Sequence, residues 1–239
     1  MKSIFIADAH LLEPEASVYR ELLEFLHQLP DDLENLFILG DFFDFWYGYQ
    51  NLVHTVYLPV ISTLRKLSEQ GLNIYFLAGN HEINFGPGLE NLACSCHLDE
   101  LVMKLDGQRI YMTHGDQLNR DDFGNHCWRT FIRHPLVLRF IAILPPDLVW
   151  KTACWLSKKS RANGNADKKI PPQVFTSVAA ILRGPVDAAV IGHFHQPRFE
   201  TFMTPTGPRS LYLLGSWADD RAYLIHDEGR FMFRTYTPS

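Results

Sequence analysis

Residues 36–44 read Leu36-Phe37-Ile38-Leu39-Gly40-Asp41-Phe42-Phe43-Asp44, an apolar run that ends in a polar loop. Four consecutive apolar residues are typical of a strand buried on both faces, and Gly-Asp then marks a turn. On either side, short apolar runs occur at residues 3–7 and 74–77. In residues 16–29 and 53–70 the apolar residues recur with the spacing of an amphipathic helix. This alternation of strand and helix predicts an α/β fold whose parallel sheet is covered on both faces.

Beyond residue 98 the pattern becomes rich in short strands. Residues 101–105 and 109–113 flank Asp106-Gly107-Gln108, which is a hairpin signal. Further strands are expected at residues 188–191, 199–204, 210–214, 222–226 and 230–236. Because residues 118–172 are instead helical in pattern, the sequence predicts one domain over residues 1–239 with a helical insertion at 118–172.

Composition excludes several classes of protein. The chain has 239 residues, 46% of them hydrophobic, so it can bury a core and is not a disordered chain. Its net charge of -5 argues against a wholly basic nucleic-acid binder, and no nucleic-acid partner is expected. No apolar run is long enough for a membrane span, and the N-terminal run is too short for a signal peptide. Four cysteines without Cys-x-x-Cys spacing favour reduced thiols and a cytoplasmic location.

The net charge conceals two unlike parts. Residues 118–172 contain ten basic and four acidic residues, so this segment carries about +6 and the remainder about -11. The insertion is therefore cationic on an otherwise acidic chain.

Five polar motifs each follow an apolar run, at the point where a strand is expected to end. They are Asp8-Ala9-His10, Gly40-Asp41-Phe42-Phe43-Asp44, Gly79-Asn80-His81-Glu82, His114-Gly115-Asp116 and Gly192-His193-Phe194-His195. The carboxyl ends of parallel strands converge on one crevice, so these side chains are expected to meet there. A single His-x-His or Gly-Asp is weak, but five such motifs in order are difficult to attribute to packing.

The donors in these motifs are carboxylate, amide and imidazole, without thiolate. That set suits Mn, Fe, Zn, Co or Ni better than Ca or Mg, and it is large enough for two divalent ions. Asp41 is the candidate to bridge two ions about 3.5–4 Å apart, an arrangement that lowers the pKa of a bound water and neutralises charge on a phosphoryl group.

The ordered motifs resemble those of the calcineurin-like metallophosphoesterase family over nearly the whole chain. The resemblance implies a four-layer α/β/β/α sandwich with a di-metal centre between the sheets. Carried over by position, Asp8, His10, Asp41 and His195 would hold one metal, and Asp41, Asn80, His114 and His193 the other, with manganese the first choice. His81 matches a histidine that contacts the phosphate and protonates the leaving group. Asp44 matches an acid that orients this histidine in some branches, or is a turn carboxylate.

A narrower resemblance is to the UDP-2,3-diacylglucosamine hydrolase family. It is carried by Ile6-Ala7-Asp8-Ala9-His10-Leu11, by residues 38–43 with Trp46 and Gly48, by Asp121-Asp122 after the His114 motif, and by Gly215-Ser216-Trp217. The segment Trp155-Leu156-Ser157-Lys158-Lys159-Ser160-Arg161 is similar to that family's helical lid. These enzymes cleave the pyrophosphate of a UDP-linked diacyl sugar in lipid A synthesis. The family usually carries Gly-Asn-Arg-Asp where this chain has Gly79-Asn80-His81-Glu82.

Several residues have a functional and a structural interpretation. In the insertion, Ser157, Lys158, Lys159, Ser160 and Arg161 are candidates for binding substrate phosphate, and the apolar residues of 131–144 could face a lipid; alternatively this is an ordinary amphipathic hairpin. Asp121 and Asp122 could bind a sugar or base, or cap a helix. The aromatic residues of 42–49 could line a ligand pocket or belong to the core.

Together these observations predict a di-metal phosphoesterase. The expected substrate is UDP-2,3-diacylglucosamine, cleaved to lipid X and UMP, with the insertion in peripheral contact with the cytoplasmic face of the inner membrane. The alternatives are a metallophosphodiesterase or phosphatase for another small or lipidic phosphoester, and a non-catalytic interaction module on the same fold.

Overall fold

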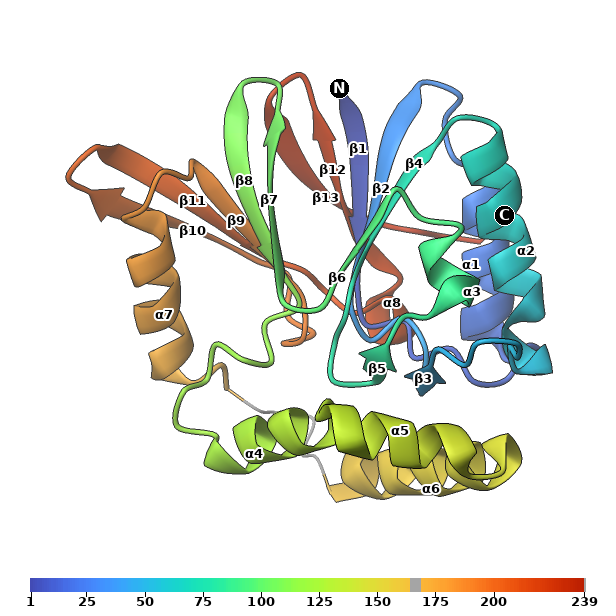
Figure 1. Ribbon diagram of the computed structural model, residues 1–239. Helices are drawn as coiled ribbons and strands as arrows, with labels where there is room; N and C mark the ends of the chain where they lie inside the picture. The colour runs from blue at the N-terminus through green and yellow to red at the C-terminus, as the bar shows by residue number, and fades with distance from the viewer. Residues whose placement is uncertain (164–168, 239) are drawn as a thin grey trace.

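The computed structural model describes residues 1–163 and 169–238, and for residues 125 and 158–163 the backbone alone. Two sheets pack face to face, and each is covered by helices on its outer face (Figure 1). The order of layers is therefore α/β/β/α, and the family fold expected from the motifs is confirmed.

The first sheet has six strands in the order β13-β12-β1-β2-β4-β6. Its parallel part consists of β1 (Lys2–Ile6), β2 (Leu33–Leu39), β4 (Asn73–Leu77) and β6 (Ser95–His97). The antiparallel hairpin β12 (Ala222–Asp227) and β13 (Arg230–Thr235) extends it beside β1.

The second sheet has five strands in the order β10-β11-β9-β8-β7. They are β7 (Glu100–Leu105), β8 (Gln108–Thr113), β9 (Ala188–Ile191), β10 (Arg198–Thr204) and β11 (Gly207–Leu213). The predicted turn at Asp106-Gly107 joins β7 to β8, where Asp106 and Gly107 adopt positive φ angles of 44° and 86°. A separate pair, β3 (Trp46–Tyr47) and β5 (Glu82–Asn84), lies at the carboxyl end of the first sheet.

The core forms three apolar layers around these sheets. Phe5, Phe37 and Leu77 of the first sheet pack against Ile110 and Met112 of the second. The outer face of the first sheet is covered by α1 (Ser17–His27) and α2 (Leu58–Glu69), and that of the second by α7 (Pro172–Leu182). The remaining short helices are η1 (Thr55–Tyr57), α3 (Pro87–Glu90) and α8 (Trp217–Asp220).

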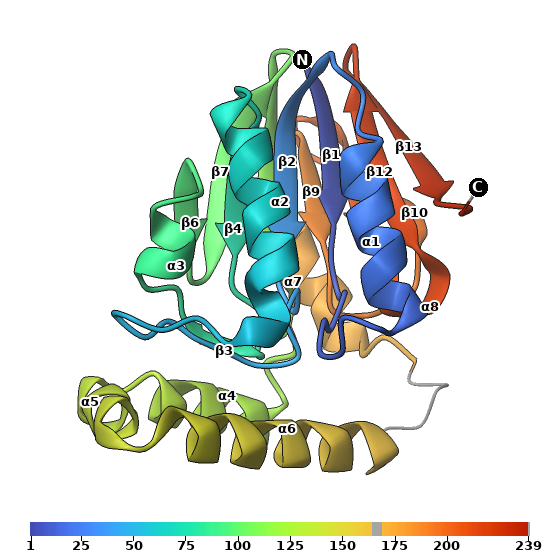
Figure 2. The same cartoon turned by 90° about the vertical axis from the view of Figure 1, so that its right-hand side faces the viewer.

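Three helices of the predicted insertion lie across the carboxyl ends of the strands (Figures 1 and 2). They are α4 (Phe123–Ile132), α5 (Pro135–Ile143) and α6 (Pro146–Asn163), which we call the three-helix insert. Ile141 and Cys154 of the insert pack on Phe45, Tyr47 and Ile83 of the body. The insert therefore covers the edge of the sheets at which the five polar motifs were expected to meet.

The strand and helix expectations differ from the structure mainly in short elements. The helix expected at 53–70 divides into η1 and α2 at Leu58, next to Pro59, whose ring favours the first turn of a helix. The parallel sheet is covered by helices on one face and by the second sheet on the other. Strands β3, β5 and β6 have two or three residues, too few to produce a recognisable period.

Candidate metal centre

The five polar motifs converge between the two sheets, below the carboxyl ends of their parallel strands. Asp8 and His10 follow β1, Asp41 follows β2, and Asn80 follows β4. From the second sheet, His114 follows β8, while His193 and His195 follow β9. The loops are tied together across the sheets, since Asp8 Oδ2 accepts the backbone N–H of His193 at 2.9 Å.

The backbone at these loops is unusual. Asp8, His10, Asp41, His193 and His195 all have positive φ angles, between 46° and 71°. The other non-glycine residues with positive φ, Asp106, Arg221 and Glu228, lie at hairpin turns or a helix end. Left-handed backbone in side chains other than glycine is costly and clusters at functional sites. The strain is thus concentrated on five of the seven expected metal ligands.

Three groups of carboxylate and imidazole side chains have ligand atoms within 4.8 Å of one another. They are Asp8 with His10 and His195, Asp41 with His114 and His193, and His10 with Asp44 and His81. The first two groups are subsets of the two ligand sets implied by the resemblance. His193 and His195, although two residues apart, therefore belong to different groups.

Asp41 lies between the groups and is almost completely buried. Its Oδ2 atom is 3.5 Å from His114 Nε2 and 3.7 Å from His81 Nε2. Burial alone would raise the pKa of the Asp41 carboxyl, but the imidazoles of His81 and His114 hold it well below its usual range. Asp41 is therefore an ionised carboxylate placed to serve both groups.

Three of the histidines, His81, His114 and His195, are oriented by a contact at Nδ1, so that Nε2 faces the centre. His114 Nδ1 donates to the carbonyl of Leu39 at 2.8 Å, and His195 Nδ1 pairs with Asp219 Oδ2 at 2.7 Å. His81 Nδ1 donates to the backbone carbonyl of Asp44 at 2.5 Å. Such contacts fix the ring orientation and tautomer of metal-ligating histidines.

The side chains present fit divalent metal ions. Two buried atoms, His10 Nδ1 and Asn80 Oδ1, have no hydrogen-bond partner among the described residues, and a bound ion would satisfy such lone pairs. Burial lowers the pKa of His10 to about 4, so this imidazole is neutral, as a ligand must be. The donor set of carboxylate, amide and imidazole suits borderline first-row metals.

Sequence reasoning missed the residues that hold these loops in place. The buried Glu82 carboxylate accepts four backbone N–H groups, those of Asp41, Phe42, Phe43 and Gly79, at 2.9–3.1 Å. Gly79 passes so close to Asp41 that a Cβ at this position would overlap the carboxylate. Asp219 was also missed, because its contact with His195 spans 24 residues of chain. For Glu82 a signal existed, since the residue closes the Gly-Asn-His-Glu motif.

A cavity of about 720 Å³ opens beside the centre, between the body and the three-helix insert. Asp44, Asn80 and His81 line it on the polar side. The apolar wall is formed by Phe45, Ile83, Trp128, Ile132, Ile141, Leu144, Leu148, Val149, Ala153 and Leu156. Ser157 Oγ of α6 donates to Asp44 Oδ1 at 3.0 Å across this space. The carbonyl of Asp44 thus orients His81, while its carboxylate contacts the insert.

The predicted substrate-binding residues have different positions. Ser157 lines the cavity. Asp121 and Asp122 are exposed on the turn that leads into α4, and neither lines this cavity as the described residues define it. The side chains of Lys158, Lys159, Ser160 and Arg161 lie outside the described residues. Of the aromatic residues of 42–49, Phe42, Phe43 and Trp46 belong to the core, and Phe45 lines the cavity.

The fold and the grouped side chains agree with the family found by comparison with known proteins. The chain belongs to the calcineurin-like phosphoesterase family, whose model matches residues 1–197. It is a metal-dependent hydrolase of phosphoester bonds, as the family and its hydrolase relatives indicate. The family implies divalent metals, and the grouped carboxylates and imidazoles described above are the candidate ligands.

The chain is similar in sequence to UDP-2,3-diacylglucosamine hydrolases. It is 32% identical to that of Edwardsiella ictaluri (strain 93-146) over 222 residues, covering 91% of this chain and 85% of the relative. It is 29% identical to that of Yersinia pestis bv. Antiqua (strain Angola), covering 91% of each. A solved structure described as a novel archaeal phosphodiesterase shares the fold, with a TM-score of 0.51 at 14% identity, covering 99% of this chain and 100% of that one.

Proposed function

We propose that this chain hydrolyses the pyrophosphate of UDP-2,3-diacylglucosamine, releasing UMP and the diacylated sugar phosphate lipid X, in lipid A biosynthesis. The observation that carries the proposal is the apolar cavity of about 720 Å³ that opens onto Asn80 and His81. A polar nucleotide does not need a wall of isoleucine, leucine, valine and tryptophan, whereas acyl chains gain free energy by leaving water for such a wall. The sequence similarity to hydrolases of that name supports the same substrate.

The metal ligands in this proposal are the first two groups of carboxylate and imidazole side chains, together with Asn80. Asp8, His10, Asp41 and His195 would hold one ion, and Asp41, Asn80, His114 and His193 the other, with manganese the first choice. Two such ions supply Lewis acidity for the phosphoryl oxygens and an activated water. The protein's own part is to orient the ligands: Asp219 fixes His195, the Leu39 carbonyl fixes His114, and Glu82 fixes the loop of Asp41.

His81 is proposed to contact the phosphate and to protonate the leaving group. Its Nδ1–H donates a hydrogen bond to the Asp44 carbonyl. The other ring nitrogen, Nε2, lies beside Asp41 and would contact the substrate. Because arginine usually stands here in the resembling family, His81 is also the specific feature that favours the second candidate, another phosphodiester or phosphomonoester substrate.

The three-helix insert is proposed to act as a lid on a single domain spanning residues 1–239. Several of its large apolar side chains are exposed and are not part of the cavity wall, including Phe131, Leu136, Phe140 and Ile143. The insert also carries the cationic excess of the chain, a combination typical of interfacial helices on anionic lipid. We therefore propose peripheral contact with the membrane that carries the lipid substrate.

No helix in the described part of the chain combines the length and apolar character needed to cross a bilayer. The four cysteines are free thiols, as expected in a reducing compartment. A cytoplasmic location, at the inner face of the inner membrane, is accordingly part of the proposal.

The decisive experiment measures UMP release from UDP-2,3-diacylglucosamine with Mn²⁺, beside UDP-glucose, which has the same pyrophosphate but no acyl chains. We expect a far higher kcat/KM for the lipid, and a rate no higher than for UDP-glucose overturns the proposed substrate. Hydrolysis of bis-p-nitrophenyl phosphate reports on the metal centre independently of the lipid.

A matched pair of variants tests the cavity. Ala153→Trp places an indole in the cavity wall, whereas Ala142→Trp adds the same group at an exposed position of α5. We expect A153W to lose activity on the lipid while retaining activity on bis-p-nitrophenyl phosphate, and A142W to retain both. Equal lipid activity in the two variants would exclude the cavity as the acyl site.

A further inference from the structure

The first helix of the insert turns two arginines toward the body of the protein. The side chains of Arg129, in the last turn of α4, and of Arg133, the first residue after this helix, are only 12% and 14% exposed. Their neighbours Trp128 and Phe131 are about half exposed. Burying a guanidinium is costly unless its donors are satisfied, so the partners of these two arginines are informative.

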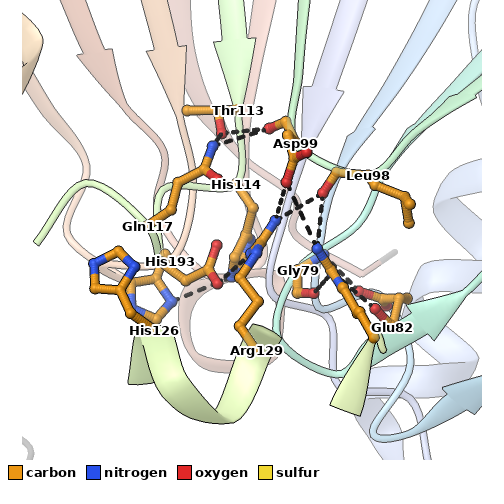
Figure 3. A network of polar contacts seen from close by, with 12 residues as sticks. Gly79, Glu82, Leu98, Asp99, Thr113, His114, Gln117, His126, Arg129 and His193 are labelled. Atoms are coloured by element: carbon orange, nitrogen blue, oxygen red, sulfur yellow. Dashed lines mark hydrogen bonds and ion pairs between the residues drawn. The ribbon is translucent and has the colours of Figure 1, made fainter. Parts of the chain in front are cut away.

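Arg129 ties α4 to the loop that carries His114. It forms an ion pair with the buried Asp116, two residues after His114, and donates to Asp99 Oδ1 at 2.7 Å and to the Leu98 carbonyl at 2.8 Å (Figure 3). The pKa of Arg129 is raised by Asp116 and Asp99 in spite of its burial, which would lower it. Arg129 is therefore the charge-paired member of the two.

Arg133 binds backbone carbonyls instead. It donates to the carbonyl oxygens of Gly79 at 2.9 Å and Glu82 at 3.0 Å, and to that of Leu98 at 3.2 Å. Its nearest carboxylate contact is Asp99, at 3.7 Å. Burial, together with the charge of Arg129, lowers the pKa of Arg133 from its usual value. The guanidinium remains charged, because arginine does not deprotonate in proteins.

Two of the three carbonyls that Arg133 binds, those of Gly79 and Glu82, bracket Asn80 and His81. On the opposite side of the same loop, the Glu82 carboxylate accepts the N–H of Gly79, and Asp41 Oδ1 accepts that of His81 at 3.0 Å. The body also donates the Trp46 N–H to the His81 carbonyl at 2.9 Å, so the insert holds the loop through the carbonyls of Gly79 and Glu82 on either side. Removal of Arg133 would take away the contacts of the insert with the Gly79 and Glu82 carbonyls and leave Asn80 and His81 to the contacts made by the body.

The same helix also lines the cavity. Trp128 and Ile132 each precede one of the arginines in sequence and form part of the apolar wall, opposite Asn80 and His81. We infer that Arg133 is a positioning residue that fastens the three-helix insert to the loop 79–82 and so couples the position of α4 to that of His81. The structural part of this inference is independent of the substrate; its consequence for catalysis rests on the proposed function.

The structural test is hydrogen exchange of the metal-free protein. Arg133→Met keeps the apolar stem and removes every donor, and Arg139→Met makes the same change at an exposed site on α5. We expect the segment 79–84 to exchange about tenfold faster in R133M and at the wild-type rate in R139M, since one hydrogen bond to a charged group is worth at least about a tenfold change in an opening equilibrium. Unchanged exchange in R133M overturns the inference. If R133M does not fold, Arg133→Lys, which keeps the charge but cannot reach three carbonyls, takes its place with the same expectation.

The kinetic test separates positioning from binding. With bis-p-nitrophenyl phosphate, R133M is expected to lose about tenfold in kcat with little change in KM, and R139M to behave as the wild type. Guanidinium ion at a concentration below denaturation is expected to restore part of the kcat of Arg133→Ala, which leaves room for it. A loss in KM alone, or no rescue, would contradict a positioning role. If the wild type releases no UMP, the proposed substrate is rejected. Hydrogen exchange and the hydrolysis of bis-p-nitrophenyl phosphate would still test the role of Arg133.

Discussion

His81 shows how a single backbone contact determines the chemistry of a side chain. With Nδ1–H donated to the Asp44 carbonyl, only Nε2 can face a substrate. We expect His81→Ala to lower kcat about a hundredfold to a thousandfold, as loss of a general acid does, while the protein still binds two Mn²⁺ ions. The measurement is hydrolysis of the lipid substrate beside metal analysis. His27→Ala, at an exposed position on α1, is the control. An unchanged kcat would remove His81 from the reaction.

Asp219 acts on the centre through another residue. Its carboxylate holds His195 Nδ1 at 2.7 Å, which directs Nε2 toward Asp8 Oδ1 at 3.3 Å. Asp219→Asn removes the charge that favours this ring orientation, so we expect about tenfold weaker binding of Mn²⁺, measured by calorimetric titration. Activity should return at excess metal. Asp220→Asn, its exposed neighbour on α8, should bind Mn²⁺ as the wild type does, and equal affinities in the two variants would exclude an orienting role for Asp219.

At the level of residues, the sequence indicated the centre but not its geometry. Asp8 and His10 were recognisable because they follow an apolar run, but that run does not indicate the backbone conformation beyond it. The structure has positive φ at both residues, 55° and 46°. Asp219, Arg129 and Arg133 were not recognisable, because their roles depend on contacts made only when distant segments fold together.

Among the elements, Glu82 at the start of β5 links two loops that follow different strands. One carboxylate accepts N–H groups from the loop after β2 and from the loop after β4. Glu82→Gln replaces one carboxylate oxygen by an NH₂ group, which cannot accept a hydrogen bond from the backbone N–H groups that it faces. We expect a loss of about 3 kcal/mol in the free energy of unfolding, since hydrogen bonds to a buried charge are worth about 1.5–3 kcal/mol and a donor is left unsatisfied. Urea unfolding measures it, with Glu90→Gln at an exposed position of α3 as the control; equal stabilities would contradict the linking role.

The longer elements were predictable because their apolar residues recur with a clear period. The strands at β1, β2 and β4 and the helices α1 and α2 follow directly from such runs. Helix α7 (Pro172–Leu182) was not foreseen: its buried residues Val174, Val178 and Leu182 recur every four residues, but Ser177 lies on the same buried face and Ala180 is exposed, so the apolar pattern is weak. Strands β3 and β5 pair where the loops of Asp41 and His81 meet. The local sequence of neither strand therefore predicts it.

For the whole molecule, the basic residues of the insert fall into two sets with different contacts. The insert was expected to present its basic residues to a ligand or a membrane, and it is the cationic part of the chain. Two of those residues, Arg129 and Arg133, instead bind the body through Asp116, Asp99 and backbone carbonyls. Part of the positive charge thus fastens the insert to the body, and the proposed contact with an anionic lipid surface depends on other basic residues, of which Arg139 and Lys151 are exposed.

Membrane contact through the insert is therefore a prediction about the outer face of α5. Phe140 and Ile143 are 58% and 78% exposed and lie outside the cavity wall, so replacing both by serine leaves the centre intact. We expect this double variant to bind phosphatidylglycerol-containing vesicles at least about tenfold more weakly, since full burial of each side chain is worth roughly 1.5–3 kcal/mol. Phe199→Ser with Met203→Ser removes equally exposed apolar groups from β10, the edge strand of the second sheet, and should bind vesicles as the wild type does. Both variants should hydrolyse bis-p-nitrophenyl phosphate normally. Equal vesicle binding by the two double variants would show that α5 does not face the membrane. Loss of apolar groups from α5 would then have no larger effect on binding than the same loss from β10.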